Sequence, residues 1–165
     1  MSNLAYTDDY KERFELIDGK IIMMLPRPRI DHSRALGNIF SEFRTYLKGK
    51  KCEAFADSVD VYLDEKNHFI PDVMIICNKN IITDLNIQGA PDLVVEVLSP
   101  STAKNDKGIK KDIYEKFGVK EYWIVNTVDK SVEVYLNNNG RFYLDNVYVY
   151  FTDEEIDEND ALAND

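Results

Sequence analysis

The chain has 165 residues, a hydrophobic share of 44% and a formal net charge of -10, which indicates one folded domain with a sizeable core. The acidic balance argues against a dedicated nucleic-acid coat protein, because such a protein needs a basic face. No apolar run reaches the roughly 20 residues of a membrane span, and the first residues lack a signal-peptide pattern, so we expect a cytoplasmic protein without a membrane partner.

Acidic and basic residues are unevenly distributed along the chain. Residues 152–165 carry seven acidic side chains and no basic one, and we expect this tail to fray from a single domain that spans residues 1–151. Residues 27–51 carry seven basic and two acidic side chains, a net charge of +5. This segment is either a solvated helix face or a local basic surface that could meet nucleic acid.

The chain has two cysteines, Cys52 and Cys77, and two histidines, His32 and His68. The cysteines are widely spaced, and in a cytoplasmic protein we expect reduced core residues rather than a disulfide. So few ligands also argue against a zinc site built from cysteine and histidine.

The first predicted elements are a hairpin and a helix. Residues 14–24, FELIDGKIIMM, place two apolar runs on either side of Asp18-Gly19, a dipeptide that favours a two-residue hairpin turn. The segment LPRPR then interrupts regular structure, because proline removes a backbone donor. Asp31 is the predicted N-cap of a helix that runs to about Leu47, with apolar residues at helical spacing.

Strands dominate the middle and the end of the chain, with a second helix between them. Residues 92–99, DLVVEVLS, are apolar enough for a central strand that is covered on both faces. A helix is expected from about Ala103 to Phe117, where Gly118 would stop it. This order implies a mixed α/β sheet with at least one helix on each face. The other strands are expected within residues 52–65, 69–77, 121–126, 131–136 and 141–151.

Two of the predicted strands open on a Pro-Asp pair, and the second of them contains a carboxylate in an apolar run, Glu96. Asp92 and Glu96 lie on one strand, so at ~3.3 Å per residue they are about 13 Å apart, too far to share a small cation. Asp72 lies on a different strand, and neighbouring strands are only about 4.8 Å apart. If the two strands pair, Asp72 and Glu96 converge into an oxygen site that suits Mg²⁺ or Mn²⁺.

The second helix carries two charged residues on its apolar face. At ~100° per residue, Asp106 and Lys110 fall among Ile109 and Ile113 instead of on the solvated side. A salt bridge between Asp106 and Lys110 over the core would explain this pattern. Because Glu96 lies on the preceding strand, we favour a polar site that the three residues share.

His32 lies on the apolar face of the first helix, in line with Leu36 and Phe43. A histidine at such a position is commonly a core residue with a satisfied hydrogen bond. At the mouth of the same sheet, it could instead position a water molecule or a phosphate group.

These segments together resemble the Uma2 family, also called DUF820, a branch of the restriction-endonuclease-like PD-(D/E)XK superfamily. The resemblance extends over roughly residues 10–137 and is carried by FELIDGKIIMM, DHSRALGNIF, VDVYLDE, PDVMII, GAPDLVVEVLSPST and GVKEYWIVN. It implies a restriction-endonuclease-like mixed β-sheet that is flanked by helices and preceded by an N-terminal β-hairpin. Asp72 matches the aspartate of the Pro-Asp motif, and Glu96 matches the second carboxylate.

The resemblance also implies a reaction, the hydrolysis of phosphodiester bonds in DNA by a metal-dependent endonuclease. Mg²⁺ or Mn²⁺ would be held by Asp72, Glu96 and the Val97 carbonyl. The superfamily pattern would next place a lysine two residues after Glu96, where this chain has Leu98. Lys110 on the adjacent helix is the natural replacement.

In this interpretation Lys110 orients a water molecule or stabilises developing charge, Asp106 fixes the position of Lys110, and His32 assists. A homodimer is expected, because this fold often pairs two sites across two DNA strands. Two alternatives stay open. One is a non-catalytic binding or assembly module, which Leu98 would indicate, and the other is a metal-dependent hydrolase of a smaller phosphate ester.

Overall fold

The computed structural model describes residues 13–24, 29–56 and 58–150 of the chain. Both the predicted acidic tail, residues 152–165, and most of the LPRPR segment lie outside these residues. Within the described part, strands form two sheets, and no helix is long and apolar enough to cross a lipid bilayer.

The small sheet has the strand order β2-β1-β5-β4-β7. The predicted hairpin is confirmed at its edge, because β1 (Phe14–Ile17) and β2 (Lys20–Met23) pair in antiparallel fashion. Asp18 and Gly19 turn the chain between them with φ values of 49° and 76°, as a two-residue hairpin turn requires. The rest of the sheet comprises β5 (Asn67–Phe69), β4 (Val61–Asp64) and β7 (Ile87–Gln88).

The large sheet has the strand order β11-β10-β9-β8-β6-β3. Its central strand is β8 (Leu93–Val97), in which each residue is buried, as the apolar run predicts. Because β8 is parallel to β9 and antiparallel to β6, the sheet is mixed. The strands that flank β8 are β9 (Glu121–Asn126), β10 (Ser131–Asn138), β11 (Arg141–Val149), β6 (Val73–Ile76) and β3 (Glu53–Ala56).

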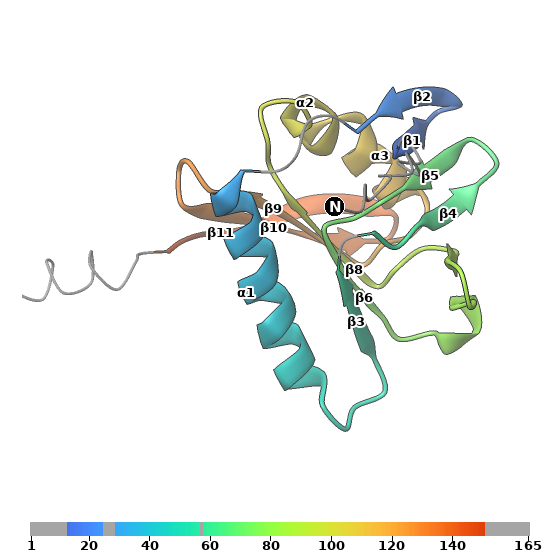
Figure 1. The fold of residues 1–165 in the computed structure, drawn as a ribbon, viewed down its shortest axis with the longest axis horizontal. Coiled ribbons are helices and arrows are strands. Elements are labelled where there is room, and N and C mark those ends of the chain that lie inside the picture. The colour runs from blue at the N-terminus through green and yellow to red at the C-terminus, as the bar shows by residue number, and fades with distance from the viewer. Residues whose placement is uncertain (1–12, 25–28, 57, 151–165) are drawn as a thin grey trace, which may run out of the picture.

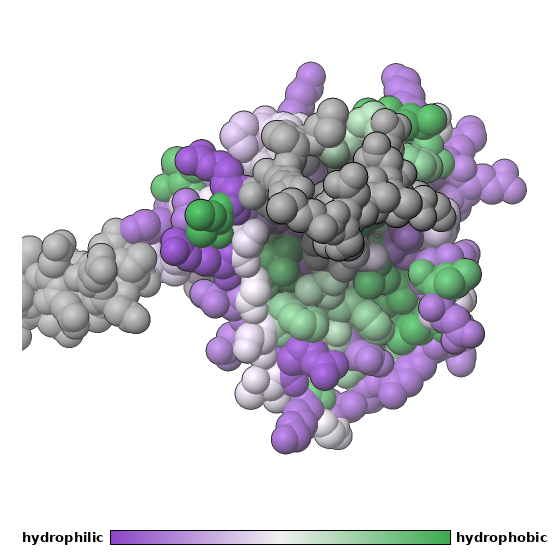
Figure 2. Space-filling view, viewed as in Figure 1, coloured by the Kyte–Doolittle hydropathy of each residue, from purple (hydrophilic) through white to green (hydrophobic). Residues whose placement is uncertain are grey.

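Helices cover both faces of the large sheet (Figure 1). Helix α1 (Ile30–Leu47) packs its apolar side on the face that carries Val95 and Val97. Helix α3 (Ile109–Lys116) packs Ile113 and Tyr114 on the opposite face. On the face shown in Figure 2, apolar side chains gather beside α1 and hydrophilic side chains form the rim. The structure therefore confirms the predicted fold class, a mixed α/β sheet flanked by helices with an N-terminal hairpin.

Two segments that were each predicted as one strand are split between the two sheets. Residues 52–65 contribute β3 to the large sheet and β4 to the small one. Residues 69–77 end β5 at Phe69 and begin β6 at Val73. The second break falls at Pro71, which has no backbone N–H to donate to a ladder. The chain thus crosses from the small sheet to the large sheet immediately before Asp72.

The second helix is also divided. Helix α2 (Ala103–Lys107) ends at Gly108, and α3 begins at the next residue. A Cβ atom at Gly108 would lie 2.9 Å from the carbonyl oxygen of Lys104, so the bend requires glycine. In the first helix, Arg29 is the N-cap residue and the predicted cap, Asp31, lies in the first turn.

The prediction of two reduced cysteines is wrong in this structure, where Cys52 and Cys77 form a disulfide. The register of the sheet is the physical reason. Glu53 of β3 lies opposite Ile76 of β6, so the next residue outward on each strand is a cysteine, and their Cα atoms are 4.0 Å apart. The bond joins the edge strand β3 to its neighbour.

Candidate active site

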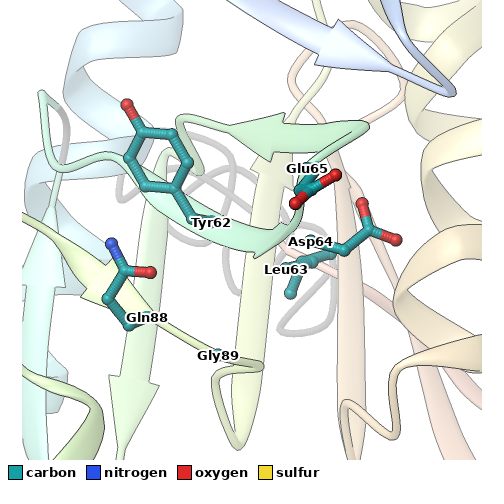
Figure 3. Close-up of a pocket in the computed structure, with 6 residues that line it drawn as sticks. All are labelled: Tyr62, Leu63, Asp64, Glu65, Gln88 and Gly89. Atoms are coloured by element: carbon teal, nitrogen blue, oxygen red, sulfur yellow. The ribbon is translucent and has the colours of Figure 1, made fainter.

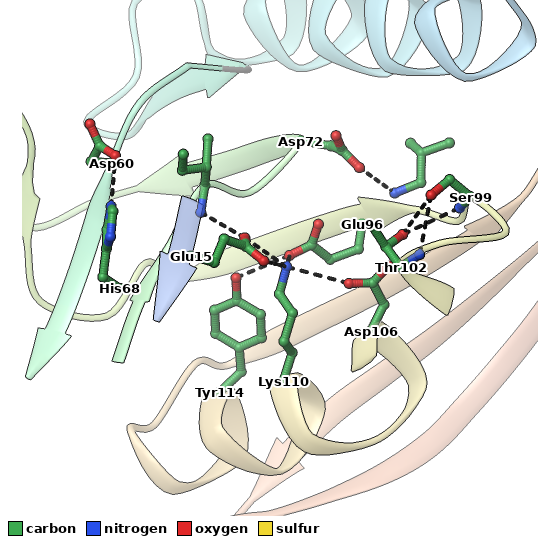
Figure 4. A network of polar contacts seen from close by, with 12 residues as sticks. Glu15, Asp60, His68, Asp72, Glu96, Ser99, Thr102, Asp106, Lys110 and Tyr114 are labelled. Atoms are coloured by element: carbon green, nitrogen blue, oxygen red, sulfur yellow. Dashed lines mark hydrogen bonds and ion pairs between the residues drawn. The ribbon is translucent and has the colours of Figure 1, made fainter. Parts of the chain in front are cut away.

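Lys110 lies at the centre of a buried group of carboxylates (Figure 4). Its Nζ atom is 2.8 Å from Glu96 Oε1, 3.0 Å from Glu15 Oε1 and 3.3 Å from Asp106 Oδ1. All four residues are buried, with at most 6% of their surface exposed. The predicted inward orientation of Asp106 and Lys110 is therefore observed, and the predicted salt bridge between them exists as part of a larger group.

Glu96 extends from the central strand toward α3. Tyr114 donates its hydroxyl hydrogen to Glu96 Oε1 at 3.1 Å, so this oxygen receives both the tyrosine and the lysine. Burial raises the pKa of Glu96 well above its ordinary value, the Lys110 ammonium opposes this change, and the carboxylates of Asp106 and Asp72 reinforce it. Three buried carboxylates around one ammonium leave an excess of negative charge, which a proton or a cation has to balance.

Asp106 lies on α2, where the bend at Gly108 keeps its carboxylate facing Lys110. Burial raises the pKa of Asp106, while Lys110 and a hydrogen bond from the Thr102 side chain lower it. The Tyr122 hydroxyl donates to the backbone carbonyl of Asp106 at 2.9 Å and fixes this turn from the central sheet. The pKa of Lys110 is itself raised by Glu96 and Glu15 against the effect of burial, so the ammonium stays charged.

Glu15 is the member of this group that sequence analysis did not identify. It lies on β1, and its Oε1 atom accepts a hydrogen bond from the backbone N–H of Ile70 at 2.9 Å in addition to the contact with Lys110. The available signal was a glutamate between apolar residues in the segment FELI. That signal does not reveal which face Glu15 occupies, because β1 pairs with β5, more than 40 residues away in the chain.

Asp72 lies at the end of β6 that adjoins Glu96. Val73 is opposite Val95 in the ladder between β6 and β8, so one further step brings Asp72 opposite Glu96. The Oδ2 atom of Asp72 accepts a hydrogen bond from the Val97 backbone N–H at 2.7 Å and is 3.3 Å from His32 Nε2. The direct pairing of the two strands meets the condition for Asp72 and Glu96 to converge, and His32 lies beside Asp72.

The two Pro-Asp pairs have matching structural roles at opposite ends of one ladder. Asp72 accepts the N–H of Val97 at the end of β8, and Asp92 accepts the N–H of Cys77 just after β6, both at 2.7 Å. Lys120 also pairs with Asp92 at 2.6 Å. Asp92 is thus separated from Glu96 by the length of β8, as the extended-strand distance predicted. Each aspartate side chain accepts a backbone N–H of the neighbouring strand at the point where the ladder between the two strands ends.

The donor atoms present suit a hard divalent cation. The described contacts of Asp72 reach Oδ2 and those of Glu96 reach Oε1, so Oδ1 and Oε2 are the oxygens that a cation would bind. The excess of carboxylates over ammonium groups favours the same chemistry. Among the described residues, no three His, Cys, Asp or Glu side chains converge on one metal position. A cation would therefore also need a backbone carbonyl, water or phosphate oxygens, as Mg²⁺ commonly does.

Access to the group is easier from the side of Asp72. The side chains of Asp72 and His32 are 18% and 12% exposed, whereas that of Lys110 is 4% exposed. The pocket in Figure 3, with a volume of about 380 Å³, lies elsewhere, on the small sheet. Its lining residues are Tyr62, Leu63, Asp64, Glu65, Gln88 and Gly89. The more exposed side of the group is therefore the side of Asp72 and His32.

Leu98, which stands where the superfamily pattern has lysine, packs against the apolar core on the α3 side of the sheet. The only described lysine that contacts Glu96 is Lys110. The position of the positive charge therefore differs from the pattern, although a lysine does reach the second carboxylate.

A mixed sheet with helices on both faces, and with carboxylates at the adjoining ends of two neighbouring strands, defines the class of restriction-endonuclease-like folds. A profile of the Uma2 family, described as "Putative restriction endonuclease", matches residues 3–163. The chain belongs to the Uma2 family.

Solved and curated relatives agree with this assignment. The crystal structure of "a putative nuclease belonging to DUF820" from Anabaena variabilis ATCC 29413 superposes with a TM-score of 0.65 at 25% identity, and covers 83% of this chain and 76% of that one. Two uncharacterized proteins of Synechocystis sp. (strain ATCC 27184 / PCC 6803 / Kazusa) are also similar. Protein slr1290 is 28% identical over 143 residues, which are 86% of this chain and 75% of that protein. Protein sll1609 is 30% identical over 138 residues, which are 81% and 77% of the two chains.

Proposed function

We propose that the protein is a metal-dependent endonuclease that hydrolyses phosphodiester bonds in DNA. The observation that carries this proposal is the contact of Lys110 with Glu96 at 2.8 Å, on the strand that pairs next to Asp72. Lys110 contacts one of the two proposed metal ligands and the strand of that ligand pairs beside the other, in a family described as "Putative restriction endonuclease". The lysine comes from α3 in place of residue 98.

The cation in this proposal is Mg²⁺ or Mn²⁺, held by Asp72, Glu96 and the carbonyl of Val97. When bound, such an ion lowers the pKa of a water molecule and neutralises charge on phosphate oxygens. Val97 is a fitting third ligand because its own N–H already points to Asp72, and the N–H and C=O of one residue in an extended strand point to the same side.

The side chains of the protein have separate roles around this position. Lys110 fixes the orientation of Glu96 and supplies positive charge close to the developing negative charge. Asp106, on α2 before the helix bend, holds Lys110 at 3.3 Å. His32 lies beside Asp72 at the more exposed end of the site and orients the attacking water or a phosphate oxygen.

The proposed substrate is DNA, and the proposed assembly is a homodimer with one site for each strand. The basic segment of residues 27–51 includes the whole of α1, the helix that brings His32 to Asp72. Because the whole chain has a net charge of -10, binding should be weak and strongly dependent on salt.

The test is a cleavage assay with purified protein, Mn²⁺ or Mg²⁺, and plasmid DNA, single-stranded DNA or RNA. The variants Asp72→Asn, Glu96→Gln and Lys110→Met should each lose at least about 100-fold in rate. Asp92→Asn is the matched control, because it also removes a carboxylate that accepts a backbone N–H at 2.7 Å. It should retain cleavage within about twofold of the wild-type rate.

Two outcomes would contradict the proposal. Cleavage that survives all three site substitutions would point to a contaminating nuclease. Equal losses in Asp72→Asn and Asp92→Asn would show that Asp72 has only the structural role that the two aspartates share.

A binding or assembly module without catalysis is the second candidate, and two observations favour it. Leu98 is part of the apolar packing, and the Lys110 ammonium already has three carboxylate partners. Calorimetry with Mn²⁺ distinguishes the candidates. The nuclease should bind about one ion per chain with Asp72 and Glu96 intact, whereas the module should bind none at millimolar concentrations.

A further inference from the structure

We propose that Glu15 is a positioning residue of this site, which holds Lys110 and the backbone before Asp72 at the same time. This inference deepens the proposed function and rests on it. Glu15 comes from the N-terminal hairpin, whereas the proposed metal ligands come from β8 and from the residue that precedes β6. The hairpin would thus be a working part of the site and not only an edge of the small sheet.

The carboxylate of Glu15 makes two different contacts, one with a backbone N–H and one with the Lys110 ammonium. Its Oε1 atom accepts a hydrogen bond from the Ile70 N–H at 2.9 Å and lies 3.0 Å from Lys110 Nζ, and its Oε2 atom lies 3.3 Å from the same Nζ. The side chain is 7% exposed, so water competes little for these contacts. The backbone of β1 is held to β5 by the pairing of Leu16 with His68.

The contact with Lys110 directs the lysine toward Glu96. Nζ lies between the carboxylates of Glu15 and Glu96, at 3.0 Å and 2.8 Å. Without the charge of Glu15, the ammonium would be held by Glu96 and Asp106 alone and would shift from its position between Glu15 and Glu96. A displacement of the order of 1 Å at a reacting centre can change the rate by about 100-fold.

The contact with Ile70 acts on the other carboxylate. Ile70 and Pro71 form the crossing from β5 to β6, and Pro71 has no N–H, so the Ile70 N–H is the last backbone donor before Asp72. By accepting this hydrogen bond, Glu15 fixes the crossing two residues before Asp72. Loss of a group that orients a metal ligand typically reduces metal affinity or activity by about 10- to 100-fold.

The two contacts can be separated by substitution. Glu15→Gln retains a carbonyl oxygen that can accept the Ile70 N–H but loses the charge next to Lys110. Glu15→Ala loses both contacts. Asp60→Asn is the control, because it neutralises a carboxylate just before β4 that is paired with His68 at 2.6 Å and has no contact with Lys110 among the described ones.

The two Glu15 variants should have different effects on kcat and on Mn²⁺ affinity. Glu15→Gln should reduce kcat by about 30-fold and change KM for DNA by less than about threefold, with Mn²⁺ affinity near the wild-type value. Glu15→Ala should reduce kcat further and weaken Mn²⁺ binding by about tenfold. Hydrogen exchange of the Ile70 amide should accelerate in Glu15→Ala but not in Glu15→Gln. Asp60→Asn should match the wild type in kcat, KM, Mn²⁺ affinity and hydrogen exchange.

A double-mutant cycle tests whether Glu15 acts through Lys110. Once Lys110→Met has removed the ammonium, adding Glu15→Gln should change kcat by less than about twofold, because coupled residues do not contribute additively. If Glu15 only stabilised the fold, its variants would lower the melting temperature and the number of Mn²⁺ sites per chain, with kcat per filled site unchanged.

The outcomes separate this inference from the proposed function. A wild-type chain that neither binds Mn²⁺ nor cleaves DNA would overturn both. An active wild type whose Glu15→Gln variant retains its kcat, or whose losses add fully to those of Lys110→Met, would overturn only the role of Glu15.

Discussion

At the scale of single residues, Lys110 is the positive charge around which the buried acids are arranged. Glu15, Glu96 and Asp106 surround it within 3.3 Å, and burial raises the pKa of both Glu96 and Asp106. In the folded protein these two carboxyl groups therefore ionise less readily than they would in water. This arrangement is stable only while the ammonium is in place.

Replacement of Lys110 by methionine should lower the free energy of unfolding by about 3–5 kcal/mol at neutral pH, because it leaves buried carboxylates without a counter-charge. Urea denaturation monitored by circular dichroism measures this loss. The double variant Lys110→Met/Glu15→Gln should regain part of it, since one of the unpaired charges is then absent. A double variant no more stable than Lys110→Met would contradict the charge explanation.

Asp92 should make stability depend on pH in the acid range. Its pKa is lowered by the hydrogen bonds from Lys120 and the Cys77 N–H, against the effect of burial. An acid whose pKa is lowered on folding stabilises the native state above its unfolded pKa, about 3.8, and this stabilisation is lost as the pH falls through the folded value.

The variant Asp92→Asn should therefore be less stable than the wild type by about 1–2 kcal/mol at pH 7, where the exposed Lys120 contributes little. The difference should shrink as the pH decreases below about 3.8. Thermal unfolding at a series of pH values gives both quantities. A difference that stays constant down to pH 2 would mean that the charge of Asp92 is not its cause.

At the scale of elements, the bend between α2 and α3 sets the orientation of Asp106 relative to Lys110. The two residues are four positions apart, on either side of Gly108. Gly108 brings its own backbone so close to the Lys104 carbonyl that a methyl group has no room. The geometry of the polar group therefore depends on a residue that contacts none of its charged atoms.

Gly108→Ala should lower the free energy of unfolding by about 1–3 kcal/mol, because the Cβ atom would lie 2.9 Å from Lys104 O and the turn has to shift. It should also reduce cleavage more than Gly37→Ala, a control on α1 where a Cβ atom meets nothing within 4 Å. Chemical denaturation and the cleavage assay measure the two effects. Equal rates for both variants would show that the bend does not orient the site.

The distance along the chain between interacting residues explains which parts of the structure could be predicted from the sequence. The inward orientation of Asp106 and Lys110 follows from residues that are close in the chain, so helical spacing revealed it. The division of residues 52–65 and 69–77 between two sheets depends on which distant strands pair. Glu15 was missed for the same reason, and so was the disulfide, because each requires a register that no local pattern contains.

At the scale of the whole molecule, the candidate site lies where the two sheets meet. Glu15 belongs to the small sheet, Glu96 to the large sheet, and Asp72 to the segment that connects them. Lys110 on α3 contacts both Glu15 and Glu96. Any movement of one sheet relative to the other would therefore change the distances on which the proposed chemistry depends.

The disulfide lies at the opposite end of β6 from Asp72. It closes a loop of about 25 residues, a loop length for which a crosslink stabilises a protein by about 3 kcal/mol. Reduction should thus lower the melting temperature while Mn²⁺ affinity stays within about twofold of the oxidised value. Scanning calorimetry and titration with and without a reductant test this prediction, with Cys52→Ala/Cys77→Ala as the control that reductant should not change.

A disulfide is uncommon in a reducing cytoplasm. The bond therefore does not favour the cytoplasmic location, which stays a prediction. Alkylation of cysteines in intact cells, followed by mass spectrometry, would report the oxidation state directly. Full alkylation of both residues would mean that β3 is held to β6 without a covalent bond.

The hydrogen bond from Val97 to Asp72 has a consequence for the way such chains can change over time. Because this aspartate completes a strand ladder, as Asp92 does at the other end, a descendant without the proposed hydrolysis could still be selected to keep it. Glu96 has no comparable backbone partner among the described contacts, so drift in an inactive lineage should reach Glu96 and Lys110 before Asp72. The Pro-Asp pair is therefore a marker of the fold, and the buried glutamate with its lysine is the better marker of the proposed activity.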